Sequence, residues 1–259
     1  MFKKGIHIKL SRTVRLMAQG LLLAGLAVLT LSAVSYRKHA VVRATDIRME
    51  DVLEEHLVDR TYLKEILVKQ FESDLSGVPV EYIDINNVES MFRSDPYIRD
   101  AEVFIDKKEV LQIRVKERIP LLRMMDEEKS YYLDKQGVSI PLSKQYTARM
   151  PIVFLTKRAE AALTDKKRMD LLKLINGVNA HPFTKALVDQ IEVDQNWEYT
   201  ILPYLGKEKI RFGSTENMND KLENIRLFYK KQIGQGKWNT CQIIDVRFEG
   251  QIVCDQNNS

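Results

Sequence analysis

The chain has 259 residues, of which 44% are apolar and 29% are charged, and this composition suffices for one or two folded domains. Disorder along the whole chain is therefore excluded. The net charge of +4 is uneven, because eight basic and no acidic residues lie at or before Arg43, which leaves −4 on the remainder. Such a mildly acidic body lacks the clustered Lys and Arg that bind phosphate backbones, so we expect no nucleic-acid partner.

An uncharged apolar run of 21 residues extends over 16–36. As a helix it rises about 30 Å, the thickness of a hydrocarbon core, so the run predicts a single transmembrane helix. Five basic residues precede it and three follow it, which predicts a cytoplasmic tail over 1–15 and a body on the far side. A cleaved signal peptide, with Ala33 and Ser35 before the cut, is one alternative, and a buried core helix is another.

The segment after residue 40 predicts one small α+β domain. Apolar residues at helical spacing and alternating residues indicate, in order, an extended stretch over 41–49, a helix over 60–71, a short helix beginning near Asn86, and strands over 98–106 and 110–116. Asp95-Pro96 is expected to stop the second helix. The polar residues Lys107, Lys108 and Glu109 predict the turn between the two strands.

Beyond Pro120 the pattern predicts a strand-rich region that contains two helices. The expected helices cover 165–176, ended by Gly177, and 215–233, followed by Gly234. The expected strands are 121–125, 131–134, 152–155, 187–193, 198–203, 209–212, and a terminal hairpin of 241–248 and 251–254.

The sequence contains no motif that indicates catalysis. Its four histidines are scattered, none at metal-ligand spacing with another His or Cys, so we expect no metal site. Gly234-Gln235-Gly236 follows a helix and lacks the further glycine of a dinucleotide loop, and we interpret it as a connector. The acidic residues 126–128 are interpreted as a solvated hairpin tip. We therefore expect neither an enzyme nor a cofactor.

Cys241 and Cys254 flank the predicted terminal hairpin. If Phe248 pairs with Gln251, Asp245 lies opposite Cys254, and Cys241 lies about 13 Å further along at about 3.3 Å per residue. A disulfide tolerates Cα atoms no more than about 7 Å apart. Although an exported compartment permits disulfides, we expect both thiols to be free.

Several segments together carry a family resemblance. They are DPYIRDAEV over 95–103, LQIRVKERIP over 111–120, YLDKQG over 132–137 and IDVRF over 244–248. The first two resemble the end of the POTRA domain of the bacterial cell-division family FtsQ/DivIB, with its V-x-E-R-x-P exit. The third is similar to that family's hydrophobic-Asp-x-x-Gly turn, and the fourth to its V-D-L-R-Y strand. The chain departs from the family in lacking Trp-Pro between the last two POTRA strands and in having Phe248 in place of Tyr.

The resemblance implies a POTRA-like domain over 40–118 and a β-rich domain over 119–259. It implies a non-enzymatic scaffold of the divisome, in the bacterial inner membrane at the division septum, with its body in the periplasm. The implied partners are FtsB/FtsL-type coiled-coil proteins and other divisome components, and no small-molecule substrate is implied. Such a scaffold would link early division proteins to septal cell-wall synthesis.

The expected binding site is the terminal hairpin, because a last strand with an open edge offers backbone groups to a partner's strand. The positions that match the family motif are Arg247, Phe248, Gly250 and Val253, with Gln251 and Ile252 as their neighbours. Phe248 would be an apolar anchor and Arg247 a charged contact. Alternatively, Phe248 and Val253 simply fill the core.

Two other classes of protein remain as alternatives. A POTRA-bearing export or assembly factor would share the first domain. A membrane-anchored cell-wall enzyme would need a cleft with a nucleophile or with carboxylates of perturbed pKa.

Overall fold

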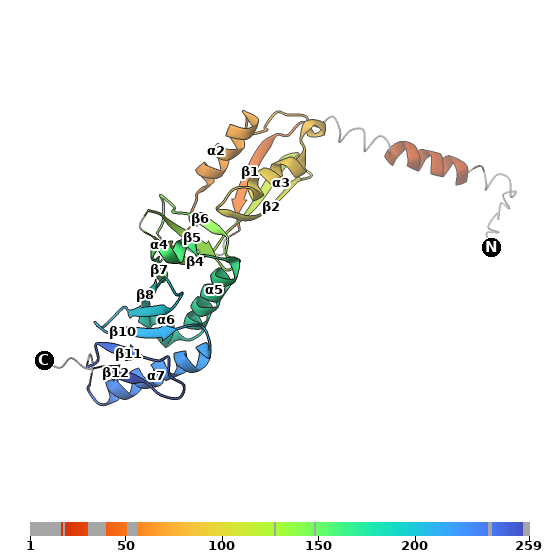
Figure 1. The fold of residues 1–259 in the computed structure, drawn as a ribbon. Helices are drawn as coiled ribbons and strands as arrows, with labels where there is room; N and C mark the ends of the chain where they lie inside the picture. Colours follow the sequence, from red (N-terminus) through yellow and green to blue (C-terminus); the bar gives the residue numbers. More distant parts are fainter. Residues whose placement is uncertain are drawn as a thin grey trace, which may run out of the picture. The chain divides into compact units, whose positions relative to one another are not determined.

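The computed structural model describes residues 17, 19–30, 40–50, 56–126, 128–147, 149–237 and 240–255. The chain forms two compact units, which are described separately (Figure 1). The first comprises the described residues of Met1–Met49, Arg60–Phe92 and Ala101–Val115, and the second comprises those of Glu50–Asp59, Arg93–Asp100 and Lys116–Ser259. The predicted mixed α+β class with a strand-rich C-terminal region is confirmed.

Residues 17 and 19–30 are helical, and their apolar side chains, such as those of Leu21 and Leu29, are exposed. Within the described part of the chain, no helix has both the length and the apolar character that crossing a membrane requires. The predicted span over 16–36 also includes residues 16, 18 and 31–36, which lie outside the described residues.

The first elements follow the predicted order of strand, helix, helix, strand and strand. They are β1 (Ala44–Met49), α2 (Arg60–Phe71), the short 3₁₀ helix η1 (Val80–Tyr82), α3 (Ile85–Arg93), β2 (Ile98–Ile105) and β3 (Val110–Glu117). The strands form a sheet in the order β1-β3-β2, with β1 parallel to β3. On β3, Leu111, Ile113 and Val115 are buried in alternation, as the period of two predicts.

The second unit contains a sheet in the order β12-β11-β10-β9-β8-β7-β4-β5-β6. Its strands are β4 (Pro120–Met125), β5 (Ser130–Asp134), β6 (Ser139–Pro141), β7 (Ile152–Leu155), β8 (Val188–Val193), β9 (Tyr199–Pro203), β10 (Lys209–Gly213), β11 (Ile243–Asp245) and β12 (Val253–Asp255). Its helices are α4 (Lys157–Ala161), α5 (Asp165–Asn179), α6 (Pro182–Leu187) and α7 (Met218–Gly234).

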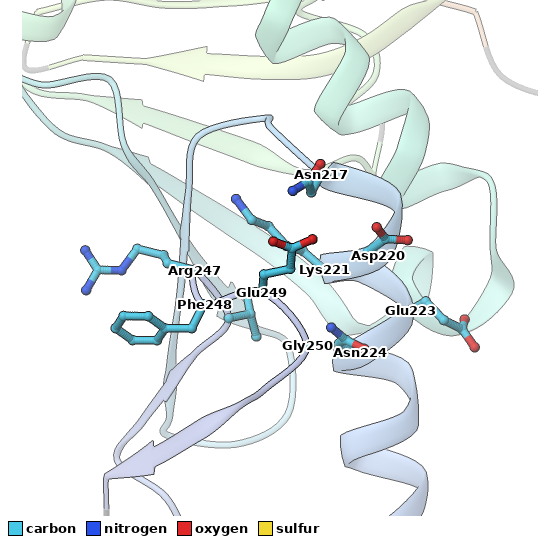
Figure 2. Close-up of a pocket in the computed structure, with 10 residues that line it drawn as sticks. Asn217, Asp220, Lys221, Glu223, Asn224, Arg247, Phe248, Glu249 and Gly250 are labelled. Carbon is cyan, nitrogen blue, oxygen red and sulfur yellow. The ribbon is translucent and has the colours of Figure 1, made fainter.

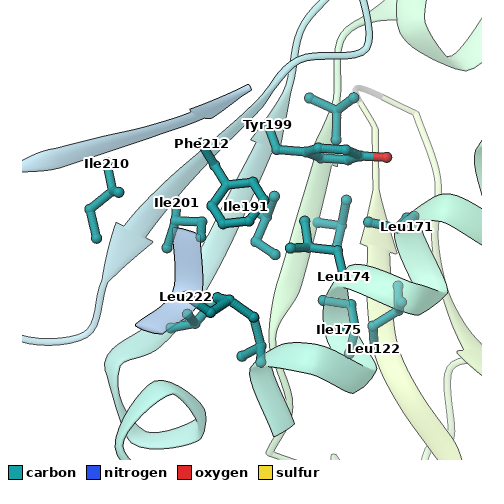
Figure 3. Packing of buried hydrophobic residues seen from close by; sticks show 14 of the residues in the cluster. Leu122, Leu171, Leu174, Ile175, Ile191, Tyr199, Ile201, Ile210, Phe212 and Leu222 are labelled. Carbon is teal, nitrogen blue, oxygen red and sulfur yellow. The ribbon is translucent and has the colours of Figure 1, made fainter. Parts of the chain in front are cut away.

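The main core lies between this sheet and its helices (Figure 3). Side chains from β4 and from β8 to β10 meet those of α5 and α7, and members with less than 2% exposure include Leu122, Leu171, Leu174, Ile175, Ile191, Ile201, Ile210, Phe212 and Ile225. At about 25 cal/mol per Å² of apolar surface, burial of each such side chain favours folding by roughly 1.5–3 kcal/mol. Burial of these side chains therefore stabilises the middle strands of the sheet, and the edge strands are hydrogen-bonded to the sheet at its two ends.

Two helices beyond the two predicted occur among the described residues of this unit. Both are short, and each begins at a polar cap: Thr156 Oγ1 accepts the N–H of Ala159 at α4, and His181 Nδ1 accepts the N–H of Phe183 at α6. The prediction that Gly177 ends α5 is also wrong. Gly177 lies inside α5 against Met218 and Leu222 of α7, where the missing side chain allows close helix packing.

Glu117 and Arg118, which belong to the predicted POTRA exit motif, make polar links within the second unit. Glu117 accepts a hydrogen bond from the Val58 N–H at 3.0 Å, and its other oxygen lies 2.6 Å from His56 Nδ1. Arg118 Nη1 lies 2.9 Å from Asp134 Oδ2, and both of these side chains are largely buried. The motif thus has a structural role, because loss of one partner would leave a buried polar group unpaired.

Asp134 also forms the turn between β5 and β6. Its Oδ1 accepts the N–H groups of Gln136 and Val138 at 2.9 and 2.8 Å. Gly137 has a φ of +78°, a conformation that a side chain would strain. The hydrophobic-Asp-x-x-Gly motif is therefore a turn joined to Arg118 through one carboxylate.

Candidate partner-binding edge

The C-terminal hairpin forms one edge of the large sheet, next to α7 at the end of the unit that carries the C-terminus (Figure 1). β11 pairs with β10 in parallel and with β12 in antiparallel orientation. β12 is the last strand in the order, so no strand of the described residues pairs with its outer edge. Such an edge leaves backbone N–H and C=O groups for another strand.

The paired part of the hairpin is shorter than predicted. The strands expected over 241–248 and 251–254 are reduced to the three residues each of β11 and β12. One reason is a local bond that competes with strand pairing: Asp245 Oδ1 accepts the Arg247 N–H at 3.1 Å. Gly250, with a φ of +71°, lies in the turn of the loop that replaces the predicted ladder.

Cys241 and Cys254 form a disulfide, with Cα atoms 5.4 Å apart, so the prediction of two free thiols is wrong. Ile244, rather than Asp245, lies opposite Cys254. The chain also bends at Gln242, so a distance extrapolated along a straight strand does not apply. The disulfide links β12 covalently to the segment that enters β11.

Arg247 is held by carboxylates. Its Nη2 lies 2.7 Å from Asp245 Oδ2 and its Nε 3.0 Å from Asp245 Oδ1, while its Nη1 is 3.5 Å from Glu198 Oε2. Its aliphatic part packs against Gly213, where an added Cβ would lie 2.9 Å from Arg247 Cγ. Burial alone would raise the pKa of Asp245, but the hydrogen bonds from Arg247 hold this pKa below its ordinary value.

The predicted apolar contacts differ in exposure. Phe248 is 48% exposed and Val253 is 45% exposed, so neither is a core residue. Ile252, in contrast, is partly buried and packs against the main core. Gly250 and Gln251 are exposed, and the Gln251 N–H points to Phe248 O at 3.4 Å. Phe248 and Val253 are therefore exposed apolar side chains of the hairpin.

A hollow of about 350 Å³ lies between the hairpin loop and the first turns of α7. Its lining includes Asn217, Asp220, Lys221, Asn224, Glu249 and Gly250. Figure 2 shows Arg247 and Phe248 pointing away from α7, whereas Lys221 reaches toward the loop. The hollow carries both charge signs, because Asp220 and Glu249 line it together with Lys221.

Lys221 was not singled out from the sequence. Its side chain is buried, Nζ donates a hydrogen bond to Ser214 O at 3.0 Å, and Nζ lies 5.2 Å from the centre of the Phe212 ring. Burial lowers the pKa of this ammonium, and nearby carboxylates oppose the shift. Its position in the sequence could have identified it, because Lys221 lies on the same apolar stripe of α7 as Leu222 and Ile225, and a lysine is unusual on such a stripe.

No group of three or more His, Cys, Asp or Glu residues that could hold a metal ion occurs in the part of the chain that the structure describes. His56 contacts Glu117, and His181 caps α6. His7 and His39 lie outside the described residues, as does Glu127 of the acidic turn. In that turn, Asp126 Oδ1 accepts the N–H groups of Glu128 and Lys129 at 2.7 Å each.

Two models of known protein families match this chain. A family model described as FtsQ/DivIB, C-terminal related, matches residues 119–255, more than half of the chain. The chain belongs to the FtsQ/DivIB family. A model for a POTRA-like domain matches residues 40–116 of this FtsQ/DivIB protein. No curated relative matches it.

Membership in the FtsQ/DivIB family indicates a cell-division scaffold. Proteins of this family are generally non-enzymatic and belong to the membrane at the division site. The POTRA-like match covers the strand-helix-helix-strand-strand segment, and the C-terminal match covers the nine-stranded sheet with its open edge.

Proposed function

We propose that this FtsQ/DivIB protein is a single-pass membrane scaffold of the divisome, and that its edge strand β12 binds FtsB/FtsL-type coiled-coil partners by strand addition. The observation that carries the proposal is the edge itself. β12 ends the sheet, and no described strand covers it. Val253 on this strand and Phe248 in the loop between β11 and β12 are exposed. Binding there would link early division proteins to septal cell-wall synthesis.

Strand addition suits the chemistry of this edge. Backbone hydrogen bonds to β12 would supply affinity for any extended segment, and alternate side chains would supply specificity. Phe248 is a large apolar side chain that loses exposed surface when covered, so we assign it as the anchor. The disulfide between Cys241 and Cys254 stiffens the short strand before a partner arrives, which lowers the ordering cost of binding.

We propose that Arg247 positions the hairpin loop, whereas the sequence suggested that it contacts the partner directly. Because Asp245 and Glu198 already hold its guanidinium, it positions the loop that presents Phe248. A partner carboxylate would have to compete with these two acids. We therefore place the main binding energy on Phe248 and the β12 backbone, with Gly250, Gln251, Ile252 and Val253 as neighbours.

The proposed location is the inner membrane at the septum, with the tail in the cytoplasm and the body in the periplasm. The apolar run over 16–36 and the basic residues before it support this orientation. The disulfide supports it independently, because disulfides persist in oxidising compartments such as the periplasm.

Binding of purified FtsB/FtsL complex from the same bacterium to the detergent-solubilised full chain tests the proposal. Phe248→Glu places a charge on the anchor, and we expect it to weaken binding at least tenfold. Because Phe248 is half exposed, we expect the melting curve to stay unchanged. Leu227→Glu is the matched control, since Leu227 is 47% exposed on α7. Equal affinity of wild type and Phe248→Glu would refute the assigned anchor.

A further inference from the structure

A second and larger hollow, of about 840 Å³, lies in the second unit away from the edge strand. It is formed where β4, β7 and β8 begin and β9 ends, beside the last turn of α5 and the start of α6. In the sheet order, β10 and β11 separate β9 from β12. The hollow is therefore not part of the proposed strand-addition site.

The rim of this hollow exposes two large apolar side chains. Tyr204 is 55% exposed and Leu205 is 62% exposed, both in the loop that follows β9. The loop is tied to α6, because the Tyr204 N–H donates a hydrogen bond to Leu187 O at 2.7 Å. Further apolar lining comes from Leu121, Met150 and Val188. An exposed apolar patch held in place in this way is typical of a surface that a partner covers.

The charges that line the hollow are mostly positive. Lys135, Arg149 and Lys185 lie in its wall, and no carboxylate of the described residues forms a salt bridge with them. The acidic residue in the lining is Asp189, whose Oδ2 accepts a hydrogen bond from Gln190 Nε2 at 3.2 Å. The hollow thus gathers positive charge on a body whose net charge is negative.

Arg149 connects the charged and apolar parts. Its guanidinium lies over the ring of Tyr204, 5.0 Å from the ring centre. A guanidinium that stacks on a ring keeps the N–H donors in its own plane free for a carboxylate, which it can bind through two parallel hydrogen bonds. The stacked pair therefore offers an apolar face and an anion-binding edge together.

We propose that this hollow binds an acidic segment of a partner protein, with an apolar side chain covering Tyr204 and Leu205 and carboxylates facing Arg149, Lys135 and Lys185. The charge of the wall selects an acidic partner. The exposed apolar pair selects a polypeptide over a small anion, because a small anion would leave that surface in water. Since β10 and β11 intervene, a segment here and a strand on β12 can bind the scaffold together.

The probe is a set of fluorescent hexapeptides with two central residues drawn from Leu, Ile, Phe and Tyr and with two Glu on each side. Fluorescence anisotropy measures their binding to the detergent-solubilised full chain. We expect saturable binding by the acidic set and at least tenfold weaker binding by peptides with Lys in place of Glu. Affinity should fall as salt rises, since charged groups carry the contact. No binding by any acidic peptide overturns the proposal.

Two double variants locate the binding. Arg149→Glu with Lys185→Glu reverses two charges in the wall and should weaken acidic peptides at least tenfold, with an unchanged melting curve. Lys230→Glu with Lys231→Glu reverses two exposed charges on α7 and should change affinity less than twofold. Equal losses in both double variants would show a nonspecific charge effect and overturn the proposal.

Two further arms distinguish the hollow from the β12 edge and from a lipid-binding surface. Phe248→Glu should leave peptide binding unchanged, so the two sites can fail independently. Vesicles of phosphatidylglycerol test a membrane surface as the occupant. If the vesicles compete fully with the peptides and lose affinity with the wall variant, the hollow recognises anionic lipid and the proposed protein partner is wrong.

Discussion

Arg247 joins the hairpin to neighbouring strands through its contacts with Asp245, Glu198 and Gly213. The pattern at 244–248 located a strand end and suggested a charged contact. The structure places the Arg247 guanidinium against Asp245 and Glu198 and its stem against Gly213. Glu198 precedes β9 and Gly213 ends β10, and no spacing within the 244–248 segment predicts that these two residues meet Arg247.

The Asp245 carboxylate makes the stability of the chain sensitive to acid. Its pKa in the folded chain is lower than the unfolded value of about 3.9, so its contribution is present above about pH 4 and is lost as pH falls through the folded pKa. Asp245→Asn removes this contribution. The variant should therefore melt at a lower temperature than wild type at pH 7, and the difference should shrink below about pH 4.

Melting curves of both proteins between pH 7 and pH 3 check this pH dependence. Asp255→Asn is the control, because Asp255 is exposed on the same hairpin. A difference between wild type and Asp245→Asn that stays constant over the whole range would contradict a stabilising role of the ionised carboxylate.

At the scale of elements, long segments with a clear period could be predicted, and short ones could not. α2 and α7 have apolar stripes over three or more turns, so the sequence identified both. β6, α4 and α6 have three to six residues each, too few to show a period. The signals for α4 and α6 were single caps, such as His181 before Pro182, and a single cap identifies a helix only when the neighbouring core is known.

The terminal hairpin was predicted to the correct region but in the wrong register. The true pairing is shifted by one residue from the predicted one, and the chain bends at Gln242. For these two reasons the sequence predicted free thiols where the structure has a disulfide. Register depends on the turn between the strands, and the bond of Asp245 to Arg247 begins that turn early. Phe248 and Val253 could nevertheless be proposed as contacts, because their positions match the family motif and do not depend on the exact register of the hairpin.

Removal of the disulfide should lower the stability of the second unit. Cys241 and Cys254 are 13 positions apart, and closing a loop of this size stabilises a fold by about 3 kcal/mol in the chain-entropy model. We expect the double variant Cys241→Ala with Cys254→Ala to lose roughly that free energy of unfolding. Urea unfolding measures the change, and wild type treated with a reductant should show a similar loss. Equal stability of the oxidised wild type and the variant would contradict the assigned role.

At the scale of the whole molecule, the membrane anchor and the scaffold act together in the proposed function. Confining the chain and its single-span partners to one membrane raises their effective concentration, so a modest strand-addition affinity suffices. The positive charge is concentrated near the proposed anchor, and the body carries a net −4. We therefore expect partner binding by the body to depend on local features such as the edge of β12.

The anchor predicts that the N-terminal residues stay on the mature protein. Mass spectrometry of the chain extracted from membranes should find the peptide that contains the basic residues before Leu16. A mature chain that begins after Ser35 would indicate a cleaved signal peptide and contradict the single-span topology.

The proposed function depends above all on the addition of a partner's strand to β12, and amide hydrogen exchange of the full chain with and without purified FtsB/FtsL complex is its sharpest test. Strand addition forms new backbone hydrogen bonds, so peptides that cover 250–255 should exchange more slowly in the complex, and Phe248→Glu should remove this protection. A stable complex that leaves exchange over 250–255 unchanged while protecting another surface would contradict strand addition at this edge.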